Sequence, residues 1–389
     1  MTMRGRALTE LFASSPNNNT SHDPLDDVLG MAVPPPRAGA FLTSCNSAAA
    51  PIATIRHTLR AIASESGPGE GLNRVKLLRP LVAQAHEILR ERVESGGSAE
   101  DYLRGRARLA DSVVVGLLRL ASISSGIRDG SMVAPLAAIA VGGYGRRELA
   151  PGSDLDVLFL LPQRNPSHVE GVAPATRACI GAVVACLWDL GFVVDHAARS
   201  ARECLELAKD DATVLAGLVD RRYLWGRFGL FAVLDADFTA LFAGPDAGYW
   251  REAVGSALSA TRRYGVREVQ GLDDEPDVKQ GPGGLRDLQR ALWANTRGSG
   301  RHMPPAQASL IEAQNFLWLV RCHLHFLTGR TEDRLSKSLQ PSIARRLGLG
   351  EPHGSATSPL LDLFRYHARN VVAAIESAPR QPLRLPNDR

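Results

Sequence analysis

Apolar residues recur every three or four positions over the first third of the chain, which is the spacing of amphipathic helices. One such stretch covers residues 77–89 and another covers residues 109–118, within a helical pattern that runs from about Ile52 to Ser124. Residues 1–55 instead combine an asparagine run and a proline run with small residues and show no sustained period. We therefore expect a flexible N-terminal arm followed by helices.

The pattern changes in the middle of the chain, where short apolar runs flank one helical stretch. Strands are predicted near residues 135–141, 155–161 and 192–197, and a helix near residues 172–190. After Ala201 the pattern is helical to about Ala378, interrupted by loops rich in glycine and proline. The chain is therefore predicted to be α+β, with a mixed sheet between N-terminal helices and an all-helical C-terminal part.

Two acidic residues, Asp154 and Asp156, stand at the start of the apolar run 155–161. Side chains two apart on a strand point to the same face, so both carboxylates share one side. Two charges about 6 Å apart repel by roughly 3 kcal/mol at an effective dielectric near 20. A divalent cation such as Mg²⁺ would offset this repulsion. The alternative is a solvated strand start in which Asp154 caps the turn.

Glycines precede this acidic pair. Gly142, Gly143 and Gly152 allow backbone amides to approach an anion, and the hydroxyl of Ser153 adds a donor, so we expect a phosphate group here. A dinucleotide-binding fingerprint is excluded, because its third glycine would fall on Glu148 and a strand rather than a helix follows soon after.

The composition limits the class of protein. The 389 residues, 44% hydrophobic and 22% charged, suffice for two globular domains. The net charge of +4 comes without a Lys/Arg block, so an anionic small ligand is favoured and a nucleic-acid partner is not. Five scattered cysteines predict a reducing cytoplasm, and no apolar run indicates secretion or a membrane partner.

Three segments in order carry a resemblance to a known family. They are AVGGYGRRELAPGSDLDVLFLL (140–161), PDVKQGPGGLRDLQRALW (276–293) and FLWLVRCHLHFLTGRTEDRLSKSLQPSIARRLG (316–348). The first resembles the signature of the DNA polymerase beta-like nucleotidyltransferase superfamily. All three together resemble the bacterial PII uridylyltransferases, which attach UMP to the nitrogen-regulatory protein PII.

The resemblance implies a domain layout and an activity. It implies a nucleotidyltransferase domain with N-terminal helices over residues 56–235, a helical domain over 236–380 and a tail over 381–389. The implied reaction is the Mg²⁺-dependent transfer of UMP from UTP to a tyrosine of PII, with release of pyrophosphate. Asp154 and Asp156 would hold the magnesium, with the triphosphate over the glycine loops.

The resemblance to this family also directs attention to further candidate site residues. Asp195, on the strand expected beside the acidic pair, is a candidate third carboxylate, or else a cap of the following turn. Arg146 and Arg147 are candidates for phosphate contact, or else solvated loop arginines. His323 and His325 lie two apart on a predicted helix, hence on different faces, and are expected to be packing residues.

The loop at 279–284 leaves two interpretations open. Lys279 can approach phosphate together with the amides of a helix that begins near Leu285. Alternatively, Arg286 and Asp287 pin this loop to the α/β part through an ion pair.

Known family members continue beyond the aligned region with an HD-type hydrolase domain and two ACT domains, whereas this sequence ends at Arg389. We therefore expect neither removal of UMP nor direct glutamine sensing. Two other functions stay open: another nucleotidyltransferase of this superfamily, such as an adenylyltransferase, and a catalytically silent regulatory module that binds PII.

Overall fold

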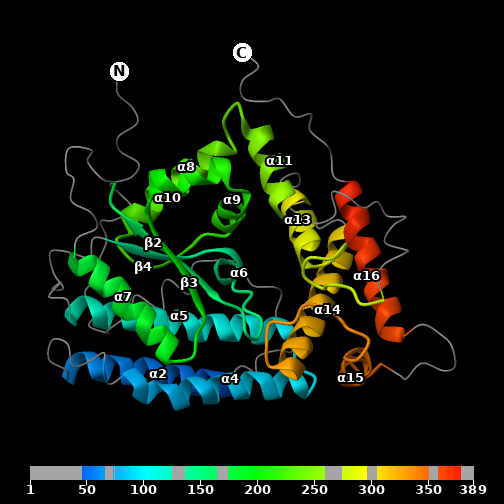
Figure 1. Cartoon of the computed structure of the whole chain (residues 1–389), viewed down its shortest axis with the longest axis horizontal. Coiled ribbons are helices and arrows are strands. Elements are labelled where there is room, and N and C mark those ends of the chain that lie inside the picture. Colours follow the sequence, from blue (N-terminus) through cyan, green and yellow to red (C-terminus); the bar gives the residue numbers. More distant parts are fainter. Residues whose placement is uncertain are drawn as a thin grey trace, which may run out of the picture. The chain divides into compact units, whose positions relative to one another are not determined.

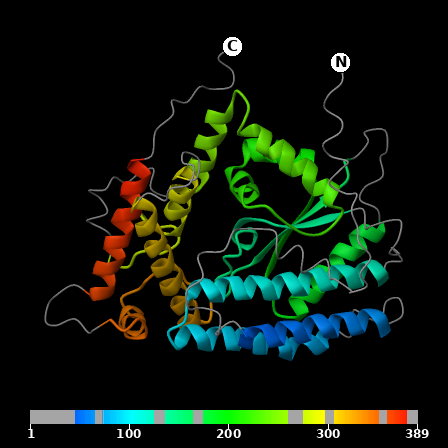
Figure 2. The same cartoon turned by 180° about the vertical axis from the view of Figure 1, so that it is seen from behind.

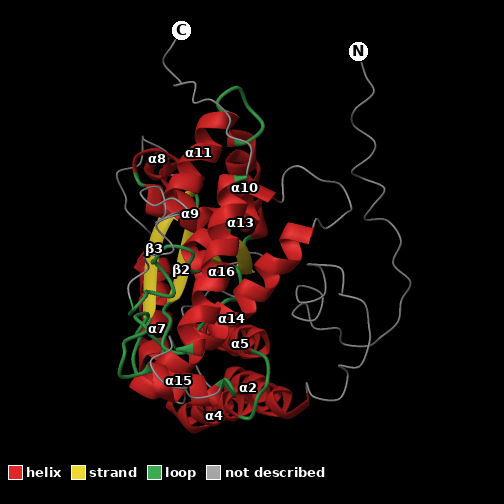
Figure 3. Ribbon diagram, turned by 90° about the vertical axis from the view of Figure 1, so that its right-hand side faces the viewer, coloured by secondary structure: helices red, strands yellow, loops and turns green. Residues whose placement is uncertain are grey.

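The computed structural model describes residues 46–65, 73, 75–124, 136–163, 174–258, 274–295, 305–349 and 358–377. All of them belong to one compact unit, Asn46–Arg389. Residues 1–45 of the predicted arm and the predicted tail 381–389 lie outside the described residues. Figure 3 shows the strands gathered in one place among helices, which confirms the predicted fold class. No helix in the described part of the chain has both the length and the apolarity to cross a bilayer.

The N-terminal helices form one packed layer. Helix α2 begins at Asn46, so the prediction of a flexible arm as far as residue 55 is wrong for residues 46–55. Ile52 and Ile55 are buried where α2 packs on the next helices, and Pro51 together with a run of alanines hid this start from the apolar pattern. The elements of the layer are α2 (Asn46–Glu65), η2 (Val75–Leu78), α4 (Arg79–Glu94) and α5 (Ala99–Ser124).

A four-stranded mixed sheet follows, in the order β3-β2-β1-β4. Strand β1 is antiparallel to both of its neighbours, while β2 and β3 are parallel and are connected by α7 (Pro174–Asp189). The strands are β1 (Ala137–Ala140), β2 (Leu155–Leu161), β3 (Val194–Ser200) and β4 (Arg222–Gly226).

Strand β4 corrects the prediction that the chain after Ala201 is helical. It has five residues, of which only Leu224 is buried, so its side chains show no clear alternation. Its partner β1 lies more than eighty residues earlier, and their pairing shifts register between Ala138 and Ile139. A strand this short depends on its partner for stability, and the local sequence does not show that partner.

Helices cover the two faces of the sheet. Figure 1 shows α5 and α7 on one side and α8, α9 and α10 on the other, in agreement with the contacts of these elements. Leu158 and Leu160 of β2 enter a core with Leu234 and Phe238. The helices of this side are α8 (Ala201–Asp210), α9 (Ala212–Val219), α10 (Phe228–Leu241) and α11 (Ala247–Leu258).

The C-terminal helices share a second core with the N-terminal ones. Leu89 of α4 and Leu103 of α5 are buried in one cluster with Leu317 and Phe364. Figure 2 shows α4 and α5 reaching from beneath the sheet to these helices. The C-terminal elements are α13 (Leu285–Asn295), α14 (Pro305–Thr328), α15 (Gln340–Arg346) and α16 (Pro359–Glu376).

The predicted domain boundary between residues 235 and 236 falls inside α10. Leu234 and Phe238, on either side of it, are buried in the same core beside the sheet. The predicted boundary therefore cuts through one packed helix, because α10 contacts β1, β2 and β4 on both sides of it.

A packing prediction concerns the loop before α13. Gly283 and Gly329 both have positive φ, +71° and +66°, but a Cβ at Gly283 would lie 2.5 Å from Cα of Ala368, whereas Gly329 has open space. We expect Gly329→Ala to cost about 1 kcal/mol of unfolding free energy through backbone strain. Gly283→Ala should cost roughly 1–3 kcal/mol more through overpacking. Urea unfolding of both variants measures the difference, and equal losses would contradict this packing.

Candidate active site

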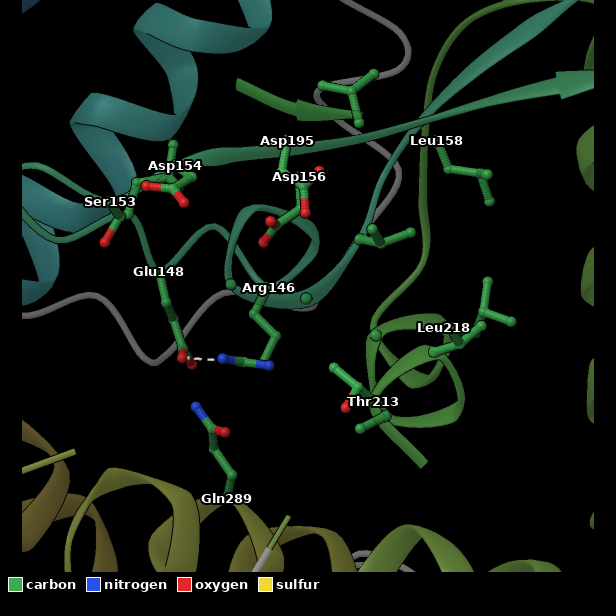
Figure 4. Close-up of a pocket in the computed structure, with 18 of the residues that line it drawn as sticks. Arg146, Glu148, Ser153, Asp154, Asp156, Leu158, Asp195, Thr213, Leu218 and Gln289 are labelled. Carbon is green, nitrogen blue, oxygen red and sulfur yellow. Dashed lines mark hydrogen bonds and ion pairs between the residues drawn. The ribbon is translucent and has the colours of Figure 1, made fainter. Parts of the chain in front are cut away.

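Three carboxylates meet at one end of the sheet. Asp156 and Asp195 are direct register partners on the parallel strands β2 and β3, and Asp154 lies two residues before Asp156. Side chains of register partners point to the same face, so the three lie together as the sequence predicted. All line a cavity of about 600 Å³, and Figure 4 shows them at its sheet side.

Burial and the neighbouring acids together change the titration of the central carboxylate. Burial, followed by the charges of Asp154 and Asp195, raises the pKa of Asp156 to about 6. Ionising Asp156 therefore costs free energy in the folded protein unless a cation compensates the charge.

The carboxylates suit a cation that arrives with a ligand. Within the described residues, no group of three or more His, Cys, Asp or Glu side chains is placed to hold a metal ion by itself. Mg²⁺ needs only one or two protein carboxylates, because waters and phosphate oxygens complete its shell. Gly142 keeps the front of Asp156 open, since a Cβ there would lie 3.1 Å from its Oδ2. The residues present therefore fit magnesium bound together with a phosphate ligand.

The first glycine turn is the single helical turn α6 (Gly142–Gly145), which follows β1. Gly142 has a φ of +55°, and Gly142 and Gly143 both line the cavity. Arg222 of β4 holds this turn from behind by donating to the carbonyl oxygens of Tyr144 and Gly145, both at 3.1 Å. The same guanidinium binds both carboxylate oxygens of Asp111 on α5, at 2.9 and 3.0 Å.

The second glycine turn precedes β2 and is held by another arginine. Arg106 of α5 is buried and donates to the carbonyl oxygens of Ala150 at 2.5 Å and Ser153 at 3.0 Å. Gly152 has a φ of +73° and approaches the segment after α14, where a Cβ would lie 3.2 Å from Cγ2 of Thr331. Ser153 lines the cavity, whereas Gly152 shapes the turn from outside the lining.

The two candidate arginines, Arg146 and Arg147, lie in different environments. Arg146 lines the cavity and is paired with Glu148, at 2.8 Å between Nε and Oε2, and with Asp220. Burial alone would lower the pKa of Arg146, but these two carboxylates raise it above its ordinary value. Arg147 does not line the cavity. Its pKa is lowered, first by burial and then by the charge of Arg222. The predicted phosphate contact of Arg147 stays a prediction, which its place outside the cavity lining does not support.

Lys279 lines the opposite side of the cavity, on the loop before α13. The Oδ1 atom of Asp277 accepts from the backbone N–H of Lys279 at 2.8 Å. The N–H groups of Leu285 and Arg286, at the predicted helix start, donate to carbonyl oxygens within the same loop. These two amides are therefore already bonded within the loop, so the predicted phosphate contact of this loop rests on the side chain of Lys279 and stays a prediction.

The neighbouring residues Arg286 and Asp287 have different roles. Asp287 is fully buried and accepts from the backbone N–H of Gly283 at 2.8 Å, so it fixes the turn of its own loop. Arg286 lines the cavity. Its pKa is lowered, first by burial and then by the charge of Arg146 across the cavity.

A half-buried carboxylate, Asp333, connects this side to the second glycine turn. It accepts from Nε of Arg321 at 2.7 Å, faces Nε2 of His325 at 3.1 Å and lies 3.7 Å from Nζ of Lys279. Burial alone would raise the pKa of Asp333, but His325 and Arg321 hold it well below its usual range. The other ring nitrogen of His325 contacts the carbonyl oxygen of Pro151. His325 is thus a polar link rather than the packing residue predicted, whereas His323 packs edge-on against Phe326.

The sequence prediction missed several of these supporting residues. Arg321 and His325 are four apart on α14 and so share a face, a relation that the helical spacing contains. Arg106 and Arg222 offer no such signal, because each binds groups at least 44 residues away along the chain.

Known proteins share this chain's sequence over most of its length. Residues 259–377, which carry Lys279, Arg286 and Asp333, match the family of GlnD PII-uridylyltransferases. The chain is 35% identical over 324 residues to the bifunctional uridylyltransferase/uridylyl-removing enzyme of Azospirillum brasilense, covering 76% of this chain and 32% of that protein. Proteins of the same name from Phenylobacterium zucineum (strain HLK1), 34% identical over 318 residues, and Caulobacter vibrioides (strain NA1000 / CB15N), 32% identical over 329 residues, give the same two coverages.

The chain spans about a third of the length of these relatives. The family match covers the helices opposite the sheet, and the alignments cover three quarters of the chain. Over the region that these alignments cover, the chain belongs to the GlnD PII-uridylyltransferase family.

Proposed function

We propose that this chain transfers UMP from UTP to a tyrosine of a PII-type signalling protein and releases pyrophosphate, with Mg²⁺ as cofactor. The observation that carries the proposal is the distribution of charge around the cavity. Asp154, Asp156 and Asp195 lie on one side, and the cationic side chains Lys279, Arg286 and Arg321 line the other. A magnesium triphosphate has the charge pattern that complements both sides.

The reaction can be described in terms of this chain's own groups. The tyrosine oxygen attacks the α-phosphorus, and a new P–O bond forms as the bond to the β-bridging oxygen breaks. Bound Mg²⁺, held by Asp154 and Asp156, would supply neutralisation of the phosphate charge. Asp195 stands beside Asp156 and can accept the proton of the attacking hydroxyl. The cationic side stabilises the pyrophosphate that leaves with the electron pair.

The proposals of PII as the protein partner and of a uridylyl group as the group transferred rest on the family match. PII enters from the description of the matched family, and uridylyl transfer enters from the names of the relatives. The described cysteines Cys179, Cys186, Cys204 and Cys322 are buried free thiols, which supports the reducing cytoplasm that we infer. UMP removal, which the relatives' names include, forms no part of this proposal.

Loss of the acidic pair should abolish transfer. We expect Asp154→Asn and Asp156→Asn each to reduce labelling of PII from labelled UTP and Mg²⁺ by at least about 100-fold, or roughly 3 kcal/mol of transition-state stabilisation. Asp237→Asn on the exposed side of α10 is the matched control and should keep full activity. Undiminished labelling by both site variants would contradict the proposal, and a preference for ATP over UTP would replace uridylyl with adenylyl transfer.

Asp156 should also make the free energy of unfolding depend on pH. Its pKa rises from 3.8 to about 6 on folding, so the stability it contributes is present below about pH 4 and is lost as pH rises through about 6. Without magnesium or nucleotide, we expect Asp156→Asn to match wild type near pH 4. At pH 7.5 the variant should be more stable by about 1–2 kcal/mol, after allowance for partial exposure. Guanidinium unfolding across this range checks the trend, and a difference that does not vary with pH would refute it.

A further inference from the structure

The cavity has an apolar end that the phosphate chemistry does not use. Beyond the acids it is lined by Leu158 of β2, Ala197 of β3 and the α9 residues Val214, Gly217 and Leu218. We call these five residues the α9 recess. Figure 4 shows Ser153 and Asp154 to one side of Asp156, and Leu158, Leu218 and Thr213 to the other.

Gly217 is the unusual member of the α9 recess. It lies inside α9, where a glycine destabilises the helix relative to alanine. Packing does not require it, because a Cβ at Gly217 would meet nothing within 4 Å, and its φ is not positive. At Gly145, by contrast, a Cβ would collide with the backbone of Asp220 at 1.8 Å. The absence of a side chain at Gly217 leaves open space on the cavity wall, and the packing of the fold does not require this absence.

We infer that the α9 recess holds the nucleobase of the nucleoside triphosphate, an inference that rests on the proposed function. The acids and the cationic side chains engage the triphosphate, so the base lies at the remaining, apolar end of the same cavity. Aliphatic side chains suit the faces of a flat ring. Asp211 and Thr213 line the cavity beside the recess. Oδ1 of Asp211 caps α9 by accepting from the backbone N–H groups of Thr213 and Val214, which leaves its Oδ2 and the hydroxyl of Thr213 at the side of the recess that would receive the polar edge of a base.

The test uses Gly217→Leu in the full chain. Leucine favours a helix over glycine, so the variant should fold at least as well as wild type while its side chain fills the recess. Gly181→Leu is the matched control, because Gly181 lies inside α7, also has nothing within 4 Å of a built Cβ and does not line the cavity. Binding of UTP and of inorganic triphosphate, each with Mg²⁺, is measured by calorimetry for all three proteins.

Comparing the two ligands distinguishes contacts to the base from contacts to the phosphates. We expect Gly217→Leu to weaken UTP binding at least tenfold and to leave triphosphate binding unchanged, while Gly181→Leu changes neither. Equal losses for both ligands, or no loss for either, would overturn the base assignment. Unchanged UTP binding with a raised KM for PII would also overturn it and would assign the recess to the acceptor tyrosine. Failure of wild type to bind either ligand would overturn the proposed function itself.

Discussion

Two arginines, the buried Arg106 and the half-buried Arg222, fix the geometry on which the site depends. Arg222 and Arg106 bind the carbonyl oxygens of the two glycine turns from behind, and both are tied to α5, one through Asp111 and the other by its own position in that helix. Hydrogen bonds from a charged donor contribute about 1.5–3 kcal/mol each, and an unpaired buried guanidinium is costly. The turns therefore keep their shape without a ligand, and the carboxylates of β2 start from a fixed position.

The cavity depends on both halves of the chain. The sheet and the turn before it supply the acids, and the segments after residue 273 supply Lys279, Arg286 and Arg321, whose charges face them. These halves are not independent, because α4 and α5 share a buried core with α14 and α16. Asp333 adds a polar connection, since it binds the cationic side directly and reaches the second glycine turn through His325. A single packed unit thus sets the distance between opposite charges.

The sequence predicted features that depend on local geometry. Strand periodicity places Asp154 and Asp156 on one face, and the expectation of a neighbouring strand placed Asp195 beside them, as the register shows. Features that depend on partners far along the chain were missed. Strand β4 needs β1 in order to exist, and the environments of Arg146 and Arg147 depend on which groups the turn brings near each of them. No local pattern distinguishes one arginine from its neighbour when the deciding partner is Asp220 or Arg222.

Two positions that break local rules lie at the cavity. Like charges are adjacent at Asp156 and Asp195, and a helix contains a glycine at position 217 that its packing does not require. Each of these choices lowers the stability of the protein without ligand, because repulsion and helix propensity both oppose folding. Deviations of this kind are expected where a ligand supplies the compensation. Under the proposed function, a magnesium nucleotide would compensate both at once, since its cation would offset the acids and its base would fill the space beside Gly217.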